Sequence, residues 1–541
     1  MSTKVLIGAL AAIVIVGGAA IAVTQYIFRP SNDEAIELVP EDAQFYLNVF
    51  MRPSNGQKTA IEDLLEAGDV TADEATDRIA EVVDRALEDV GLTFEEDIDP
   101  TIGNQAAVFA SDFGATLDST TPLPDQPPEA MEAALLVAIK DRDKAEELID
   151  VADEQTDAEI TGVETYEGFE YTIYEDESAV GFVEGFAVVG TEAGFKAVVD
   201  TANDGDSLGS SDAYQDVTGR LHDDNLGILY LNFASIVQEA RQSGSLTEQD
   251  ENSLEMLGDS LEKPYAIAAH ADSEGIVVES AIPIPSEGTV SELFDVLTRE
   301  TNVEDLPGDS WIALGAPEVG RIAELFFEIG TQLEEFTDED MAELEAQFEA
   351  QTGLSLRAHV FDGLKGVRFF ISGGIGPGTR GAVILDTTDE GVAADIIGVL
   401  RGLAEEQAVA VSDLDLEGYE TGFSFIDPTA TDSVHVVGDG ARIVAGFGED
   451  ATRAALEGGD SLAESEKFGG ATELLDDYEP YFYLDLDPPL AAFRNFIAPT
   501  ITDYPAATLD PLLDAASSIA VGGKRDGDYL MQKLILGVEQ E

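Results

Sequence analysis

The segment DDNLGILYLNF at residues 223–233 resembles DDYEPYFYLDL at residues 476–486, and it is one of several segments that occur twice in the same order. PEDAQFYLNV at 40–49 resembles PGDSWIALGA at 307–316, and AALLVAIKDRDKAEELI at 133–149 resembles GAVILDTTDEGVAADII at 381–397. GDSL occurs at 205–208 and again at 459–462. A series of matches that keeps its order at a nearly constant spacing indicates an internal duplication.

Each repeated part has the same alternation of elements. Apolar strands of six to nine residues alternate with acidic amphipathic helices, and one helix start is marked by Thr337 followed three residues later by Asp340. Strands 265–271 and 275–283 meet at a short turn, as do strands 517–523 and 528–537, which is typical of antiparallel pairs. We therefore predict an α+β fold in which each half is a mainly antiparallel sheet with amphipathic helices. The predicted parts are an anchor at 1–29, a tether at 30–37, and two repeats at 38–300 and 301–541.

The N-terminal region carries a long apolar run. Residues 5–23 read VLIGALAAIVIVGGAAIAV, without a charge, between Lys4 and Arg29. Such a run can cross a hydrocarbon core about 30 Å thick as a helix, whereas a signal peptide usually has a shorter apolar core. Residues 20–22 (AIA) would nevertheless suit a cleavage site. We predict a single-pass anchor in the cytoplasmic membrane with the N-terminus inside and the body outside, and keep a signal peptide as the alternative.

The charge of the chain excludes some functions. Its 541 residues include 110 Asp or Glu and 27 Lys or Arg, which gives a net charge of −83. Such a surface repels phosphate backbones, so we expect no nucleic-acid partner. Only ten of the basic residues are Lys, and an excess of carboxylates with little Lys resembles the surfaces of proteins from salt-adapted organisms. The absence of Cys excludes disulfides and thiolate chemistry. We predict adaptation to high salt, and keep exposure to abundant divalent cations as the alternative.

Several short motifs suggest chemistry, but each has a simpler structural interpretation. The GDSL segments match the hallmark of an esterase family, yet no Asp-x-x-His partner is present, and a turn with a helix N-cap explains them better. The four His residues show no zinc-helix spacing; they are His222, His270, His359 and His435. Asp413, Asp415 and Glu417 resemble the start of a calcium loop whose twelfth position is Ser424 instead of an acid. SGGIGPGTRG at 372–381 lies between two strand-like segments and predicts a hairpin loop. We assign no catalytic, cofactor-binding or metal-binding residue and expect no cofactor.

One polar-aromatic pattern occurs three times at the ends of apolar strands. Its members are Tyr46 and Asn48, Tyr230 and Asn232, and Tyr483 and Asp485. Because side chains alternate along a strand, each aromatic ring and its polar neighbour share one face. The polar side chain can bond to the local backbone where the strand ends, which is a structural role. The functional alternative is a surface patch that binds a partner.

The segment VPEDAQFYLNV at 39–49, behind a single anchor and before a duplicated body, resembles the bacterial family catalogued as domain of unknown function 3352. The resemblance covers the anchor, the Val-Pro-x-Asp-Ala-x-x-Tyr segment and the size of the chain. It implies a membrane-associated bacterial protein of uncharacterised role, without catalytic residues to transfer.

These observations favour a non-enzymatic envelope protein that binds or scaffolds something outside the cytoplasmic membrane. Its partners would be the membrane, through the N-terminal helix, and an envelope protein or an apolar ligand. A first alternative is a carrier of a lipid or other apolar molecule, which predicts an apolar cavity between the two halves. A second alternative is a hydrolase, which requires Ser, His and an acid in one cleft.

Overall fold

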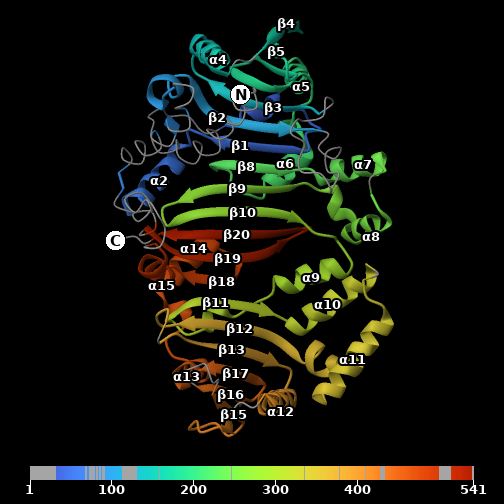
Figure 1. The fold of residues 1–541 in the computed structure, drawn as a ribbon, viewed down its shortest axis with the longest axis vertical. Helices are drawn as coiled ribbons and strands as arrows, with labels where there is room; N and C mark the ends of the chain where they lie inside the picture. The colour runs from blue at the N-terminus through green and yellow to red at the C-terminus, as the bar shows by residue number, and fades with distance from the viewer. Residues whose placement is uncertain are drawn as a thin grey trace.

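The computed structural model describes residues 32–538 except 68–69, most of 72–91, 112–130, 157–158, 245, 334, 377, 408–409, 427–432, 499–512 and 514. Its described strands form one sheet in which every pairing is antiparallel (Figure 1), so the predicted α+β class is confirmed. From one edge to the middle, the strands are β4 (Ile160–Tyr166), β5 (Phe169–Tyr174), β6 (Ser178–Val183), β7 (Phe186–Thr191), β3 (Ala133–Ile139), β2 (Ile102–Ala110), β1 (Phe45–Phe50), β8 (Gly227–Leu231), β9 (Tyr265–Asp272) and β10 (Gly275–Pro283).

The second half of the chain repeats this strand order. From the other edge to the middle, the strands are β14 (Ala410–Asp413), β15 (Gly422–Ile426), β16 (Ser433–Asp439), β17 (Arg442–Phe447), β13 (Arg380–Thr387), β12 (Leu364–Ser372), β11 (Ser310–Pro317), β18 (Glu479–Asp485), β19 (Ala516–Asp526) and β20 (Tyr529–Val538). β10 pairs with β20, so the two series meet in one continuous sheet. The division at residues 300 and 301 stays a prediction.

Helices lie along both sides of the sheet. Figure 1 shows α2 along one side of the sheet and α7 to α11 along the other. The helices used below are α2 (Asn55–Ala67), α4 (Arg142–Thr156), α5 (Glu192–Ala202), α6 (Asp212–Thr218), α7 (Phe233–Ser243), α8 (Glu248–Leu257), α9 (Thr289–Leu297), α10 (Val319–Gln332), α11 (Asp338–Thr352), α12 (Glu390–Glu406), α13 (Glu449–Glu457), α14 (Glu466–Leu475) and α15 (Asp487–Ala492).

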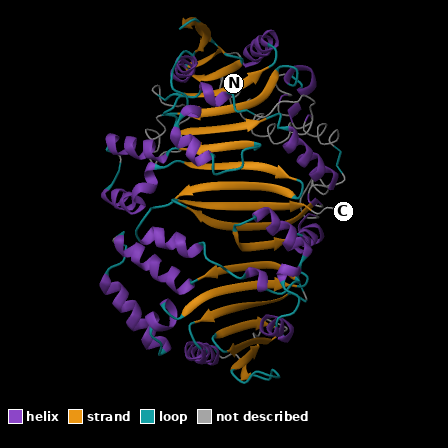
Figure 2. Ribbon diagram, turned by 180° about the vertical axis from the view of Figure 1, so that it is seen from behind, coloured by secondary structure: helices purple, strands orange, loops and turns teal. Residues whose placement is uncertain are grey.

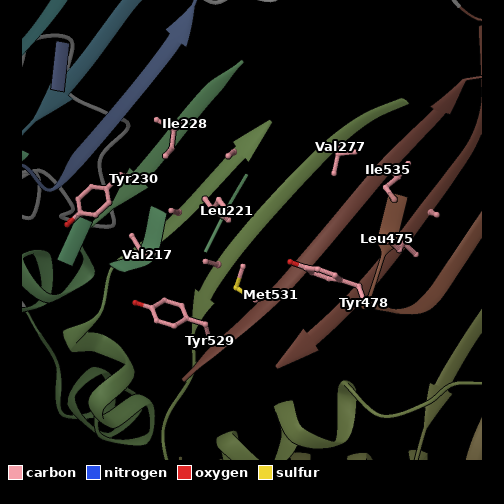
Figure 3. Close-up of a cluster of buried hydrophobic side chains, with 14 of the residues drawn as sticks. Val217, Leu221, Ile228, Tyr230, Val277, Leu475, Tyr478, Tyr529, Met531 and Ile535 are labelled. Carbon is pink, nitrogen blue, oxygen red and sulfur yellow. The ribbon is translucent and has the colours of Figure 1, made fainter. Parts of the chain in front are cut away.

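One face of the sheet carries the main core. Along β1 the burial alternates, and Tyr46, Asn48 and Phe50 point into the protein. The same core continues without interruption across the β10–β20 junction, where Val277 and Ile535 are buried. Figure 3 shows this part of the core from both halves, with side chains such as Tyr230 on one side and Tyr478 on the other. A shared core makes the two halves one folding unit at their junction.

The anchor and the tether predicted for the N-terminal region can be compared with the structure to different extents. The predicted anchor at 1–29 lies outside the described residues, and no helix within the described part of the chain is long and apolar enough to cross a membrane. The tether at 30–37 stays a prediction, and its last residues belong to the folded body. Residues Ala35–Leu38 form the short helix η1, and Ala35, Ile36 and Leu38 are buried in the main core.

Candidate functional site: an apolar face at the centre of the sheet

The face of the central strands opposite the main core is apolar and accessible. Alternation places on it two rows of side chains that run across neighbouring strands in register. We define the central apolar face as these fourteen residues: Val49, Ala269, Val278, Leu534, Val521, Phe482, Leu314 and Phe369 in the first row, and Ile276, Leu536, Ile519, Leu484, Ile312 and Ile371 in the second.

The first row is continuous from β1 to β12. Val49 and Ala269 both pair with Gly227 of β8, and from Ala269 onward each member pairs directly with the next. Neighbouring strands are about 4.8 Å apart, so a row across nine strands is roughly 38 Å long. The second row lies beside the first from β10 to β12. The result is a long apolar band that crosses the junction of the two halves.

All fourteen side chains are half-buried or exposed, whereas their strand neighbours on the opposite face are mostly buried. Leu534 is 44% exposed, Leu314 39% and Ile276 38%. Monomeric soluble proteins rarely expose a contiguous apolar patch larger than a few hundred Å² unless it binds something. The composition strengthens this argument, because Asp and Glu make up about a fifth of the chain and none lies in either row.

In the part of the chain that the structure describes, helices cover this side of the sheet mainly toward its ends. In the first half, Leu135 and Val137 of β3 pack against Val83 and Leu87 and near α4. In the second half, Ile443 of β17 and its neighbours pack against α12. α2 also covers the end of β9 at Ala271. Figure 2 shows the same architecture from behind, with helices concentrated along the flanks of the sheet. The rows between β1 and β12 therefore stay accessible.

The tyrosines of the predicted surface patch lie on the other face. Tyr46, Tyr230 and Tyr483 are each at most 1% exposed, and Asn48 is fully buried, so these four side chains do not lie at the surface. Tyr46 and Tyr230 do pair across β1 and β8, while Tyr483 lies far along the sheet in β18.

The other two patch residues have structural contacts. The Asn232 side chain accepts a hydrogen bond from the Ser235 N–H and caps α7, and Asp485 accepts one from the Asp487 N–H and pairs with Lys467. Strand alternation had predicted which side chains share a face, but not which face is covered.

A cavity of about 770 Å³ lies over the main core beside η1 and α6, and it is lined largely by polar side chains. At its base the Tyr46 hydroxyl donates to Asp33 Oδ2 over 2.7 Å, and the Tyr214 ring packs against both Tyr46 and Tyr230. Burial of the Asp33 carboxyl group raises its pKa to about 6, and the hydrogen bonds from Tyr46, Ile36 and Asn48 offset only part of that rise. The other carboxylates at the cavity wall are those of Glu34, Glu37, Glu184 and Asp223.

Two histidines that are distant in sequence lie next to this cavity. The rings of His222 and His270 stack with centroids 4.2 Å apart. Burial, and then the neighbouring His222, lower the pKa of His270 to about 4, so the ring is neutral near pH 7. The backbone N–H of His222 donates to Glu279 Oε2 over 2.8 Å. Nothing in the spacing of these residues along the chain indicated the pair.

The Ser207 hydroxyl of the first GDSL segment has a structural partner, and so do the two hydroxyl groups beside His435. Ser207 is buried, and its hydroxyl donates to Glu37 Oε2 over 3.3 Å. Ser424 and Ser433 contact the two ring nitrogens of His435, over 3.0 and 2.8 Å. Because both nitrogens are engaged by hydroxyl groups, this His is not held by a carboxylate as in a catalytic triad.

The acidic and glycine-rich motifs also have structural roles, in an ion pair and in a hairpin loop. Asp413 ends β14 and pairs with Arg401 over 2.8 Å. Among the described residues, no group of three or more His, Asp or Glu side chains could hold a metal ion. The segment 372–381 joins β12 to β13, and the predicted hairpin is confirmed.

A second cavity, of about 650 Å³, is lined by residues 298–302, 316–318, 365–368 and 386, and three of these residues are basic. Each is paired with a carboxylate: Arg299 and Lys365 with Glu318, and Arg368 with Asp386. Ion pairing leaves little positive charge for an anionic ligand. Both cavities contain charged side chains, unlike the apolar cavity between the halves that an enclosed lipid requires.

Comparison with known proteins identifies the family. A family pattern described as "Protein of unknown function (DUF3352)" matches residues 5–529. The chain belongs to this family. No curated protein matches the chain.

Two solved structures, of crystal forms I and III of TP0453, share 13% and 12% sequence identity with the chain. They cover 48% and 50% of this chain and 81% and 86% of their own, with TM-scores of 0.23 and 0.25. At these scores the likeness carries no argument about function.

Proposed function

We propose that this DUF3352 protein is a membrane-anchored, non-enzymatic lipid-binding protein whose central apolar face takes acyl chains. The observation that carries the proposal is the continuity of the first row, from Val49 to Phe369, across both halves. Covering this face removes apolar surface from water, at about 25 cal/mol for each Å² buried. The proposal places the body outside the cytoplasmic membrane and includes adaptation to high salt.

The lack of polar groups on the face favours acyl chains over an extended peptide. A peptide strand laid on the face would lose water from its N–H and C=O groups without gaining hydrogen bonds, which is costly. An acyl chain has no such groups. A sheet edge could satisfy a peptide backbone, but the face lies in the middle of the sheet, where every strand is already paired on both sides.

The dimensions favour a lipid with two chains. A bilayer core about 30 Å thick contains two chains end to end, so one chain spans about 15 Å. The first row is roughly 38 Å long and is divided near its middle by the β10–β20 junction. Ser280 and Gln532 pair across that junction beside the row and are half-buried, and Gln532 donates to the Tyr481 hydroxyl over 3.4 Å. We propose that the polar linkage of the lipid lies near this pair and that its chains extend in opposite directions.

The predicted anchor indicates that the bound lipid comes from the membrane. An apolar helix at residues 5–23 would hold the body beside a bilayer, where acyl chains are abundant. The surface charge of −83 opposes flat adsorption of the whole body on an anionic leaflet. We propose that the body takes individual lipids and does not lie on the membrane.

Photo-crosslinking tests this proposal. The full chain is reconstituted in nanodiscs that contain a diacyl phospholipid with a diazirine on one chain, and the crosslinked peptides are mapped by mass spectrometry. We expect crosslinks at Val278, Leu314 and Leu534 in addition to those at residues 5–23. The variants Leu314→Gln and Leu534→Gln should lose the crosslinks on the central apolar face. The variant Leu403→Gln, which changes an equally exposed Leu on α12, should keep these crosslinks. Crosslinks confined to residues 5–23 would overturn the proposal.

A further inference from the structure

A second exposed apolar surface lies on α10 and α11, away from the central face. Phe326 of α10 is 58% exposed, and Phe336, in the connection to α11, is 42% exposed. Phe336 packs over Gly330, where a Cβ would come within 2.4 Å of the Phe336 ring. Gly330 is four residues after Phe326, so the two rings lie on the same side of α10, one turn apart.

The surface continues onto α11. Thr337 caps this helix in a capping box with Asp340, as the sequence predicted, which makes Phe336 the residue before the cap and Met341 the fourth residue of the helix. Apolar residues at these two positions form the pattern known as a hydrophobic staple. Leu344 and Phe348 follow Met341 at helical spacing. We define the α10–α11 surface as Phe326, Phe336, Met341, Leu344 and Phe348.

The packing of α11 indicates that this surface lacks a partner among the described residues of the chain. The helix has fifteen residues and none is buried. Within the described residues it makes no extensive contact with another helix or strand. Short helices gain most of their stability from packing an apolar face, so a stripe left open on a well-capped helix is available to another molecule.

The residues around the α10–α11 surface indicate the charge that a binding partner must have. In the sixteen residues 335–350 there are seven acids and no basic residue, about twice the acidic share of the whole chain. The acids are Glu335, Asp338, Glu339, Asp340, Glu343, Glu345 and Glu349. Of these, Glu345 has an ion pair with Arg357, which lies outside the segment. A partner that covers the stripe must bring positive charge to its edges.

We infer that the α10–α11 surface binds an amphipathic helix of another protein, with large apolar side chains on one face and Lys or Arg along its flanks. A helix suits a surface formed by two helices, because its apolar side chains at i, i+3, i+4 and i+7 fit along the stripe while its backbone stays hydrogen-bonded. An anionic leaflet would be repelled by the seven acids. A second copy of this chain is also unsuitable, because it would place one strongly acidic surface against another.

A designed peptide tests this inference. The probe is a fluorescent 18-residue helix with Leu and Phe on one face and Lys on both flanks, and the control peptide has Glu in place of every Lys. Binding to the full chain in nanodiscs is followed by fluorescence anisotropy. The variant Phe326→Ser/Leu344→Ser should bind the Lys peptide at least about ten-fold more weakly than the wild type. Leu403→Ser, at an exposed Leu of α12, should bind it as the wild type does.

The alternatives give different results in the same assay. The variant Glu343→Gln/Glu349→Gln should weaken binding at about 0.1 M salt and have little effect at about 1 M, where screening reaches about 3 Å. Equal binding of the Lys and Glu peptides, or equal binding by the Ser variants, would overturn the inference. Flotation of the wild type with anionic vesicles that is lost in Phe326→Ser/Leu344→Ser would also overturn it, in favour of a lipid contact. Because the central face is unchanged in these variants, failure here leaves the lipid proposal intact.

Discussion

Glu279 of β10 and Lys533 of β20 face each other across the junction of the two halves, and their side-chain atoms are 3.2 Å apart. Both side chains are largely buried. The pair lies at the centre of the repeated strand order. Turn residues 273–274 of the β9–β10 hairpin correspond to 527–528 of the β19–β20 hairpin, and with this alignment Glu279 and Lys533 are equivalent positions. Unequal residues at equivalent positions let the junction bury an attractive pair, where two identical acids would repel each other.

Breaking this pair should destabilise the protein. Glu279→Gln leaves the Lys533 ammonium group buried without its carboxylate. Lys533→Met removes the cation from the Glu279 carboxylate, which keeps its hydrogen bond from the backbone N–H of His222. Removing one partner of a buried pair costs about 3–5 kcal/mol, whereas removing both costs less. We expect each single variant to lose about 3 kcal/mol in urea denaturation and the double variant to lose less than the sum. Additive losses would contradict a direct interaction.

Asp33 should make stability fall as the pH rises. Its pKa is raised from the ordinary value of 3.8 to about 6 in the folded protein, so the folded state favours the protonated form. The stability that this preference supplies is present below about pH 4 and is lost as the pH rises toward 6. Asp33→Asn should therefore be more stable than the wild type at pH 7.5 by about 3 kcal/mol and similar to it near pH 4. Denaturation at both pH values in constant salt measures this difference, and a pH-independent difference would contradict it.

His270 should act in the opposite direction over the same range. Its pKa is lowered from the ordinary value of 6.5 to about 4 in the folded protein, so the unfolded state binds the proton more tightly. The contribution of the neutral ring to stability is complete above pH 6.5 and is lost as the pH falls toward 4. We expect His270→Gln to lose less stability than the wild type between pH 7 and pH 4.5. The control is His359→Gln, which changes an imidazole that pairs with Asp395 near the surface.

The sequence could predict much of the fold but little of the site. The repeated segments and the short turns at Ser273 and Asp526 indicated two antiparallel parts, because both signals are local. The β10–β20 pairing joins residues that no local pattern connects.

The position of the apolar face depends on which helices cover the sheet. Alternation in β1 and β8 placed Tyr46 and Tyr230 on one face and Leu47 and Leu229 on the other, but either face could have been covered. The tyrosines carried the more conspicuous pattern and were interpreted as the possible surface. The structure buries them under η1 and α6 and leaves the aliphatic face accessible.

The central apolar face should tolerate polar residues without loss of stability. Leu534 and Leu314 are about 40% exposed and lie in neighbouring parts of one row, so replacing either with Gln removes few packed contacts. Substitutions at such positions usually change the free energy of unfolding by less than about 0.5 kcal/mol. We expect Leu534→Gln and Leu314→Gln to unfold as the wild type does when the protein is delipidated, and to lose the stabilisation that added lipid gives the wild type.

The matched control for these variants is Ile535→Gln, which changes the adjacent residue of β20 on the buried face. That change places an amide in the main core and should cost several kcal/mol with or without lipid. Thermal unfolding of the three variants, with and without a diacyl phospholipid, separates the two faces of the same strand. If Leu534→Gln were as destabilising as Ile535→Gln in the delipidated protein, the aliphatic face would be a second core rather than a binding surface.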